Sequence, residues 1–283
     1  MRYYSSFALH QSVRHGLFHP QSRQFSKILP STSHSDENIK IITKEWIDKW
    51  VIGLQLCPFA STVMKANKVK MVINRGTLPK AEDEESVAKF LGVFVSEAAA
   101  LAGKELGIDK AAQEVKIAAD YHDCDTTLLI LPKMKEYEEF KDLVEIIERN
   151  LDKMMLAPWV QVSSYHPLFK VEPRFRNGEL LDTPVDVYSK RSPYPIIQLL
   201  KQTHLQDLCL NYTLKHNPPS TGRGRVKNRS RKIFDKIAET MDRVVQRNTQ
   251  LMRELGLGKV RTMLRDLYAD APIVKDSGSN KTS

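Results

Sequence analysis

Apolar residues recur with helical and strand spacing through most of the chain after residue 38. From 39 to 52 they fall at Ile39, Ile42, Trp46 and Trp50, three or four positions apart, which predicts an amphipathic helix with both tryptophans in the core. The same spacing predicts a helix from the acidic run at 81–86 to about residue 98, and another over 136–155.

Three apolar runs between these helices predict strands, at 69–74, 126–132 and 159–165. The middle run is continuously apolar after its two threonines, as is typical of a strand buried on both faces. Alternating strands and helices favour parallel pairing through right-handed crossovers. The expected fold class is therefore α/β, with a small, mostly parallel sheet flanked by helices, and a ferredoxin-like α+β arrangement is the alternative.

The second half of the chain is less regular. Residues 166–195 are rich in Pro, Arg and Asp and predict a long loop that is functional or lid-like, or that contains a short hairpin. A helix is predicted over 196–208 after two prolines, and a helical pair over 233–255 and 259–268 around Gly-Leu-Gly. The predicted organisation is a leader (1–37), an α/β domain (38–214), a basic linker (215–232), C-terminal helices packing on that domain (233–268) and a disordered tail (269–283).

The net charge of +9 is concentrated in two segments. Residues 1–35 contribute +4 and residues 215–232 contribute +7, both without an acidic residue, so the remaining chain is slightly acidic. The net positive charge is therefore no evidence that the folded part of the chain binds nucleic acid. The run at 215–232 lacks interleaved aromatic residues, so a solvated linker is favoured over a segment that binds RNA, DNA or an acidic protein.

The leader has the composition of an organelle transit peptide. It is rich in Arg, Ser and His, lacks Asp and Glu over residues 1–35 and carries spaced apolar residues. A mitochondrial matrix location is expected, with a plastid location, or a disordered cytoplasmic tail, as alternatives. No run approaches the roughly 18 apolar residues of a membrane-spanning helix, so no membrane partner is expected.

The three cysteines, Cys57, Cys124 and Cys209, predict reduced thiols, because they are few and scattered and form no CxxC pair. Cys57 precedes Pro58, which suits the first position of a helix, so Cys57 is expected at the N-cap. A helix dipole lowers the pKa of a thiol placed there, which predicts a nucleophile or a redox sensor. The alternative is a small buried apolar side chain.

Basic residues follow the predicted parallel strands where each strand ends. Arg75, Lys133 and His166 stand at the carboxyl ends of the three strands, the edge at which open α/β sheets bind ligands. The positive charge predicts an anionic ligand. His166, held extended by Pro167, is interpreted as an acid/base catalyst or as a structural histidine.

The segment Lys-Arg-Ser-Pro-Tyr-Pro offers a second set of anion ligands. Arg191 supplies a forked donor, Ser192 and Tyr194 supply hydroxyls, and the helix predicted after them would present free N–H groups. The alternative is an Arg191 paired with Asp182 or Asp186 in the same loop. No metal site is predicted at His122, Asp123, Cys124 and Asp125, because adjacent residues do not easily converge on one ion and the cluster precedes its strand. Asp125 is instead expected to cap or position the entry of that strand.

The chain resembles the domain of unknown function 1415 family, which is mainly bacterial. Four ordered motifs and a C-terminal segment carry the resemblance: residues 53–60 (GLQLCPFA), 126–132 (TTLLILP), 161–167 (QVSSYHP), 191–195 (RSPYP) and 247–256 (RNTQLMRELG). It covers about residues 40–268, with the basic linker as an insertion. The resemblance implies that Cys57, His166 and Arg191 lie at positions typical of the family, and it implies no reaction or cofactor.

The chain departs from the family pattern at several positions. The pattern has Phe at Tyr165, Asp-Tyr at 168–169, Asn at Lys190 and His at Gln198. The leading hypothesis is an organellar enzyme that binds a small anionic, phosphorylated or carboxylated, metabolite through Arg191, with His166 as acid/base and Cys57 as nucleophile. The alternatives are an RNA- or protein-binding factor and a thiol redox sensor.

Overall fold

The structure is a computed structural model that describes residues 34–76, 84–102, 124–170, 175–176, 179–180, 185–216 and 229–269. The predicted leader, the basic linker and the tail lie largely outside these residues. The helices are α2 (Asp36–Glu45), the π-helix η1 (Trp46–Ile52), α3 (Ala60–Lys65), α4 (Glu84–Ala102), α6 (Tyr137–Lys153), the 3-10 helix η3 (Asp186–Lys190), α7 (Gln202–His216) and α8 (Arg229–Ala269). The strands are β1 (Val69–Ile73), β2 (Thr126–Ile130), β3 (Val160–Tyr165), β4 (Phe175–Arg176), β5 (Glu179–Leu180) and β6 (Ile196–Lys201).

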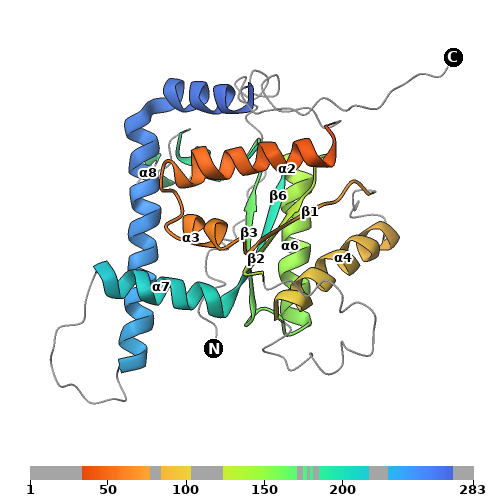
Figure 1. Ribbon diagram of the computed structural model, residues 1–283, viewed down its shortest axis with the longest axis horizontal. Helices are drawn as coiled ribbons and strands as arrows, with labels where there is room; N and C mark the ends of the chain where they lie inside the picture. The colour runs from red at the N-terminus through yellow and green to blue at the C-terminus, as the bar shows by residue number, and fades with distance from the viewer. Residues whose placement is uncertain are drawn as a thin grey trace.

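The main sheet has the order β1-β2-β6-β3, and helices flank it (Figure 1). β1 pairs parallel with β2, whereas β6 is antiparallel to both β2 and β3. The three predicted strands therefore point the same way, and the α/β class is confirmed. The expectation of a mostly parallel sheet is wrong, because β6 separates β2 from β3 and makes two of the three pairings antiparallel.

β6 also corrects the helix predicted over 196–208. Its six residues form a strand, and the helix α7 begins only at Gln202. A short apolar run fits a buried helix and a buried strand equally well, so its periodicity does not decide between them. Partners on both sides decide it here, and Ile196, Ile197 and Leu199 are fully buried between β2 and β3.

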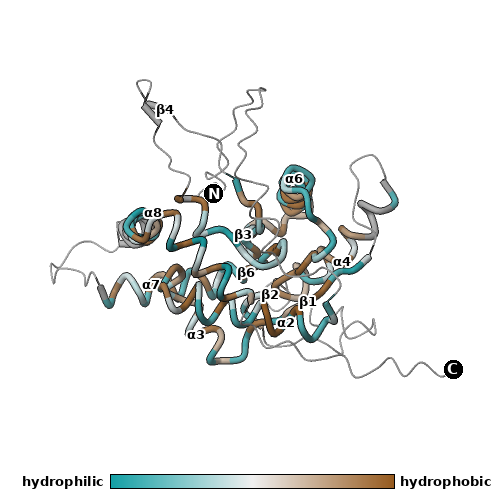
Figure 2. The backbone as a smooth tube through the Cα atoms, turned by 90° about the horizontal axis from the view of Figure 1, so that it is seen from above, coloured by the Kyte–Doolittle hydropathy of each residue, from teal (hydrophilic) through white to brown (hydrophobic). Residues whose placement is uncertain are grey.

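The two faces of the sheet carry separate layers of helices. α2, η1, η3 and α8 cover the face formed by Leu128, Ile130 and Ile196, while α4 and α6 cover the opposite face. Figure 2 shows α6 on one side of the sheet, its hydrophobic side turned inward, and α2 and α3 on the other. We call these the α8 face and the α6 face.

Two of the helical segments on the α8 face depart locally from a regular α-helix. The predicted helix over 39–52 forms, with Trp46 and Trp50 in the core, but its last seven residues are π-helical. α8 bends at Gly256, whose φ of 72° favours glycine, within the predicted Gly-Leu-Gly break. None of the helices in the described ranges has the length and apolar character needed to cross a membrane.

Candidate functional site

The carboxyl ends of β1, β2 and β3 meet at one edge of the sheet, as expected. Lys133 Nζ lies 2.7 Å from the carbonyl oxygen of Arg75, to which it donates. The backbone N–H of His166 donates to the carbonyl oxygen of Lys190 over 3.2 Å, and that of Leu131 to Pro195 over 2.9 Å. The residues from Lys190 to Pro195 thus join the predicted strand ends at this edge.

Several predicted anion ligands at this edge have protein partners. Arg75 forms an ion pair with Asp36 at 2.5 Å, and it also donates to the carbonyl oxygen of His34. The Tyr194 hydroxyl lies 2.9 Å from Nδ1 of His34. Ser192 Oγ donates to the carbonyl oxygen of Tyr194 over 2.5 Å. These contacts hold the start of α2 and the turn from Ser192 to Tyr194. A ligand-binding role for these residues and for Lys133 stays a prediction.

His166 is fully buried against α6. Its ring packs on Phe140, with centroids 5.0 Å apart, and edge-on to Tyr137. Nδ1 accepts the Leu168 N–H over 3.0 Å, so Nε2 carries the proton and lies 3.3 Å from the carbonyl oxygen of Met134. Burial lowers the pKa of His166 to about 4. These contacts favour a neutral structural histidine, and its acid/base role stays an unsupported prediction.

Cys57 lies before the helix it was expected to cap. α3 begins at Ala60 with Phe59 at the N-cap, so the predicted N-cap position is wrong. The N–H groups of Phe59 and Ala60 nevertheless hydrogen-bond the sulfur, which favours the thiolate. Burial has the larger effect and raises the pKa of the Cys57 thiol. Cys57 packs beside Phe59 and Cys209, away from α6, so it forms no pair with His166.

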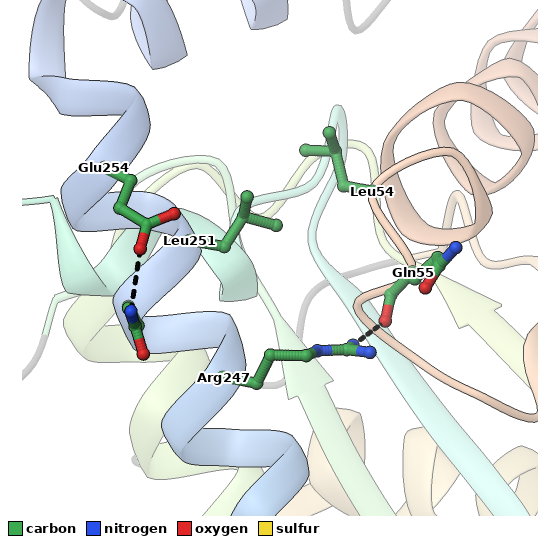
Figure 3. A pocket seen from close by; sticks show the side chains of 6 residues that line it. Leu54, Gln55, Arg247, Leu251 and Glu254 are labelled. Atoms are coloured by element: carbon green, nitrogen blue, oxygen red, sulfur yellow. Dashed lines mark hydrogen bonds between the residues drawn. The ribbon is translucent and has the colours of Figure 1, made fainter.

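The turn that carries Cys57 is fastened to α8. Arg247 donates to the carbonyl oxygen of Gln55, and Asn248 Nδ2 donates to that of Leu56 over 2.7 Å. Figure 3 shows Arg247 reaching from α8 to this turn. Leu54, Gln55, Arg247, Gln250, Leu251 and Glu254 line a surface hollow of about 350 Å³ between the two segments. Side chains of α8 thereby hold the backbone of the two residues before Cys57.

Lys190 extends onto the α8 face, where it contacts Ser163 and Tyr165 of β3. Its Nζ donates to Ser163 Oγ over 3.0 Å and lies 4.8 Å from the centre of the Tyr165 ring. Burial lowers the pKa of Lys190, and the Cys57 thiolate would raise it. We call Cys57, Ser163, Tyr165, Lys190 and Gln198 the thiol cluster. The sequence analysis did not name Lys190 as a site residue, although it begins the Lys-Arg-Ser-Pro-Tyr-Pro segment, because the contacts of a lysine in an irregular segment cannot be read from its neighbours in sequence.

Hydrogen bonds orient the rest of the thiol cluster. The Tyr165 hydroxyl donates to Gln198 Oε1 over 3.2 Å, and Gln198 Nε2 donates to Thr126 Oγ1 over 3.2 Å. Burial raises the pKa of Tyr165 to about 12, so the hydroxyl stays protonated near neutrality. Ser163 and Gln198 face each other in the β3–β6 register. The cluster is thus built from two adjacent strands, a turn and η3.

Arg191 points to a second group of side chains. Its guanidinium carbon lies 4.1 Å from the centre of the Tyr188 ring, and Arg261 Nε donates to the Tyr188 hydroxyl over 2.9 Å. Burial lowers the pKa of Arg191, while Tyr188 and Tyr268 favour its charge and Arg261 opposes it. We call Tyr188, Arg191, Arg261 and Tyr268 the arginine cluster. Sequence reasoning found Arg191 but not Arg261, which lies on the distant α8.

Trp46 connects the two clusters. Its ring meets Tyr165 edge-on with centroids 5.4 Å apart, and its Nε1 donates to the carbonyl oxygen of Arg191 over 3.0 Å. Lys190 and Arg191, adjacent in sequence, therefore serve neighbouring clusters on the α8 face.

The family model described as "Protein of unknown function (DUF1415)" matches residues 38–92 and 79–235. The chain belongs to this family. No curated protein and no solved structure matches it. The matched residues include all four strands of the main sheet and all five residues of the thiol cluster. The description of the DUF1415 family names no reaction. The side chains of the two clusters are therefore what bears on the function.

Three positions at which the sequence analysis expects a departure from the family pattern meet at the thiol cluster. Tyr165 of β3, Lys190 of η3 and Gln198 of β6 lie within hydrogen-bond or ring contact of one another or of Ser163. Tyr165 and Lys190 also interact electrostatically with Cys57. These three positions therefore lie together on the α8 face rather than in unrelated parts of the fold.

The region considered for a metal lies at the other end of β2. His122 and Asp123 are outside the described residues, and Asp125 lies 3.5 Å from Lys68 Nζ and 3.3 Å from His204 Nε2. Its backbone bonds to Lys68 and Lys201 position the entry of β2. In the described part of the chain, no three His, Cys, Asp or Glu side chains gather as metal ligands do.

Proposed function

We propose that this DUF1415 protein is an enzyme that binds a small carboxylated or phosphorylated metabolite at the arginine cluster. Two guanidinium groups flank the buried Tyr188, one over its ring and one at its hydroxyl. Like charges brought together in a partly buried place repel each other, and a bound anion would offset that cost. Arginine's planar fork suits both carboxylate and phosphate.

The observation that carries this proposal is the Tyr268 hydroxyl. Tyr268 is only 6% exposed, and its hydroxyl has no hydrogen-bond partner among the described residues. A buried hydroxyl without a partner is costly, so such groups commonly mark a missing ligand or water. Burial raises the pKa of Tyr268, and Arg191 acts in the opposite direction, which places the hydroxyl within electrostatic range of that guanidinium.

Anion binding is tested by thermal unfolding with a panel of carboxylates and phosphate esters. We expect at least one class to raise the melting temperature of the full chain. Arg261→Gln should abolish the increase, and Tyr268→Phe should weaken binding roughly tenfold, the value of one hydrogen bond to a charged group, without destabilising the free protein.

The matched control for Arg261 is Arg265→Gln, one turn further along α8, where the exposed Arg265 pairs with Asp266 at 3.0 Å. Arg265→Gln should bind like the wild type. Equal loss in both variants, or no effect of any anion, would refute the arginine cluster as the site. A strongly salt-dependent affinity for RNA that disappears on deletion of residues 215–232 would favour the nucleic-acid alternative instead.

We infer a mitochondrial location from the acid-free composition of residues 1–35. A fluorescent protein fused after residues 1–37 should enter mitochondria, and one fused to the chain lacking these residues should stay outside. Import into plastids, or no import by the fused segment, would contradict this inference.

A further inference from the structure

A surface hollow lies between α8 and the turn that follows η1. One of its walls is a stripe of α8, because residues three and four positions apart share one face of a helix. The stripe consists of Arg247, Gln250, Leu251 and Glu254, and the facing wall consists of Leu54 and Gln55 (Figure 3). We call the space between these residues the α8 hollow. Its volume of about 350 Å³ is at the lower end of the range for small-molecule sites, so it suits a small ligand.

The floor of the α8 hollow is apolar. Leu54 and Leu251 pack against the core of the α8 face, yet both side chains remain partly exposed. They come from two different segments of the chain and line the same space. Apolar surface that water reaches gains free energy when another apolar group covers it. The floor is therefore suited to an aliphatic side chain of a ligand.

Opposite charges stand at the two ends of the α8 hollow. Arg247 and Glu254 are two helical turns apart on α8, which is about 10 Å along the helix axis. Neither of them forms an ion pair with another described residue. The hydrogen bonds of Arg247 all use Nη2, so its Nε and Nη1 have no described partner. Glu254 accepts from Gln250 through Oε1 over 2.7 Å, and its Oε2 has no described partner.

The wall opposite α8 is held in place without a ligand. Gln55 has a φ of 55°, a left-handed conformation that favours glycine. A residue of another type keeps such a conformation only where its surroundings fix it. Here Arg247 donates to the carbonyl oxygen of Gln55, and Asn248 Nδ2 donates to that of Leu56 over 2.7 Å. The hollow is therefore formed in advance, which lowers the entropic cost of binding.

We propose that the α8 hollow binds a short peptide that has free termini and an aliphatic side chain. The terminal carboxylate binds Arg247, the terminal ammonium binds Glu254, and the aliphatic side chain lies on Leu54 and Leu251. Charge complementarity favours this occupant, because the hollow offers one cation and one anion with apolar surface between them. Three extended residues span about 10 Å, the separation of the two charged positions along α8. A free amino acid carries both charges on one carbon and spans much less.

The α8 hollow is separate from the arginine cluster, and the two sites share no residue. The hollow lies on the part of α8 before the bend at Gly256, whereas Arg261 and Tyr268 lie after that bend. Peptide binding therefore does not rest on the proposed function, and either one can fail without the other.

The test is saturation-transfer NMR of the tripeptide Ala-Leu-Ala with the full chain. We expect the strongest saturation at the leucine methyl groups. Acetylation of the N-terminus and amidation of the C-terminus each remove one charge, and each should weaken binding about fivefold, the upper value for an exposed ion pair. Amidation probes the contact with Arg247 without altering the turn that Arg247 holds.

Glu254→Gln probes the other end of the α8 hollow. Glutamine keeps an acceptor for Gln250, so this variant should unfold at the same temperature as the wild type. It should weaken binding of the free tripeptide about fivefold. It should not weaken binding of the acetylated tripeptide further, because two changes that remove the same interaction are not additive.

Asp242→Asn is the matched control for Glu254→Gln, because Asp242 is also exposed on α8 but does not line the hollow. It should bind the tripeptide like the wild type. Arg261→Gln should do so too, which separates this site from the arginine cluster. The inference would be overturned by no saturation of the tripeptide, by equal binding of the free and blocked tripeptides, by equally tight binding of free leucine, or by equal affinities of Glu254→Gln and Asp242→Asn.

Discussion

Replacing Gly53 with alanine is expected to destabilise the fold by about 2–3 kcal/mol, the cost of forcing an atom into filled space. A Cβ on Gly53 would lie 2.3 Å from the carbonyl oxygen of Lys49. The approach is this close because η1 ends with a π-type bond from the Gly53 N–H to Asp48, over 3.0 Å. Since backbone has to move to admit the methyl group, the turn that carries Cys57 would move with it.

Chemical denaturation of the alanine variant measures this effect. The matched control is Gly92→Ala on the exposed side of α4, where an added Cβ meets nothing within 4 Å. That control should gain up to about 1 kcal/mol, because alanine favours the helix over glycine. If Gly53→Ala proves as stable as Gly92→Ala, the close approach at the end of η1 is refuted.

Acid should destabilise the wild-type protein through His166. Its pKa is about 4 in the folded protein against an ordinary value of 6.5, so the unfolded chain binds the extra proton between these values. Stability is therefore complete above about pH 6.5 and falls as the pH drops toward 4. The loss from this one residue is about 3 kcal/mol, since each pKa unit corresponds to about 1.4 kcal/mol.

His166→Gln isolates this effect because glutamine keeps a donor for the Met134 carbonyl and does not titrate. The stability advantage of the wild type over this variant, from urea unfolding at several pH values, should shrink by about 3 kcal/mol between pH 7 and 4. Ile147→Val in α6 is the control, because it costs about 1 kcal/mol without removing an ionisable group. Its deficit should not depend on pH. Parallel acid profiles for His166→Gln and the wild type would contradict a buried neutral histidine.

Long periodic segments of this chain were predictable from the sequence. The helices around Trp46, Phe140 and Phe94 have apolar residues that repeat at the period of a helix. One apolar face of this kind is enough to predict each helix. The three strands were predictable because each is a short apolar run, and such runs indicate strands. The strand from Ile196 to Lys201 was not predictable, because a short run with four apolar residues suits a helix or a strand until the neighbours are known.

The candidate site was predictable in part. The edge at which Arg75, Lys133 and His166 gather follows from three strands that run the same way, and sequence alone indicated it. The chemistry of those residues did not follow. Whether a histidine titrates, or an arginine already has a partner, depends on burial and on groups distant in sequence, such as Met134 for His166 and Asp36 for Arg75.

The α/β class, the family, the order of most helices and strands, and the presence of Cys57 and Arg191 in distinctive motifs can all be read from the sequence. Which side chains meet became known only from the three-dimensional structure. That structure placed His166 on the α6 face, brought Lys190 to Ser163 and Tyr165, and added Arg261 and Tyr268 from α8 to Arg191. Periodicity records only the local burial of a segment, whereas a site depends on contacts between distant segments, such as the hydrogen bond between Trp46 and Arg191, which are 145 residues apart.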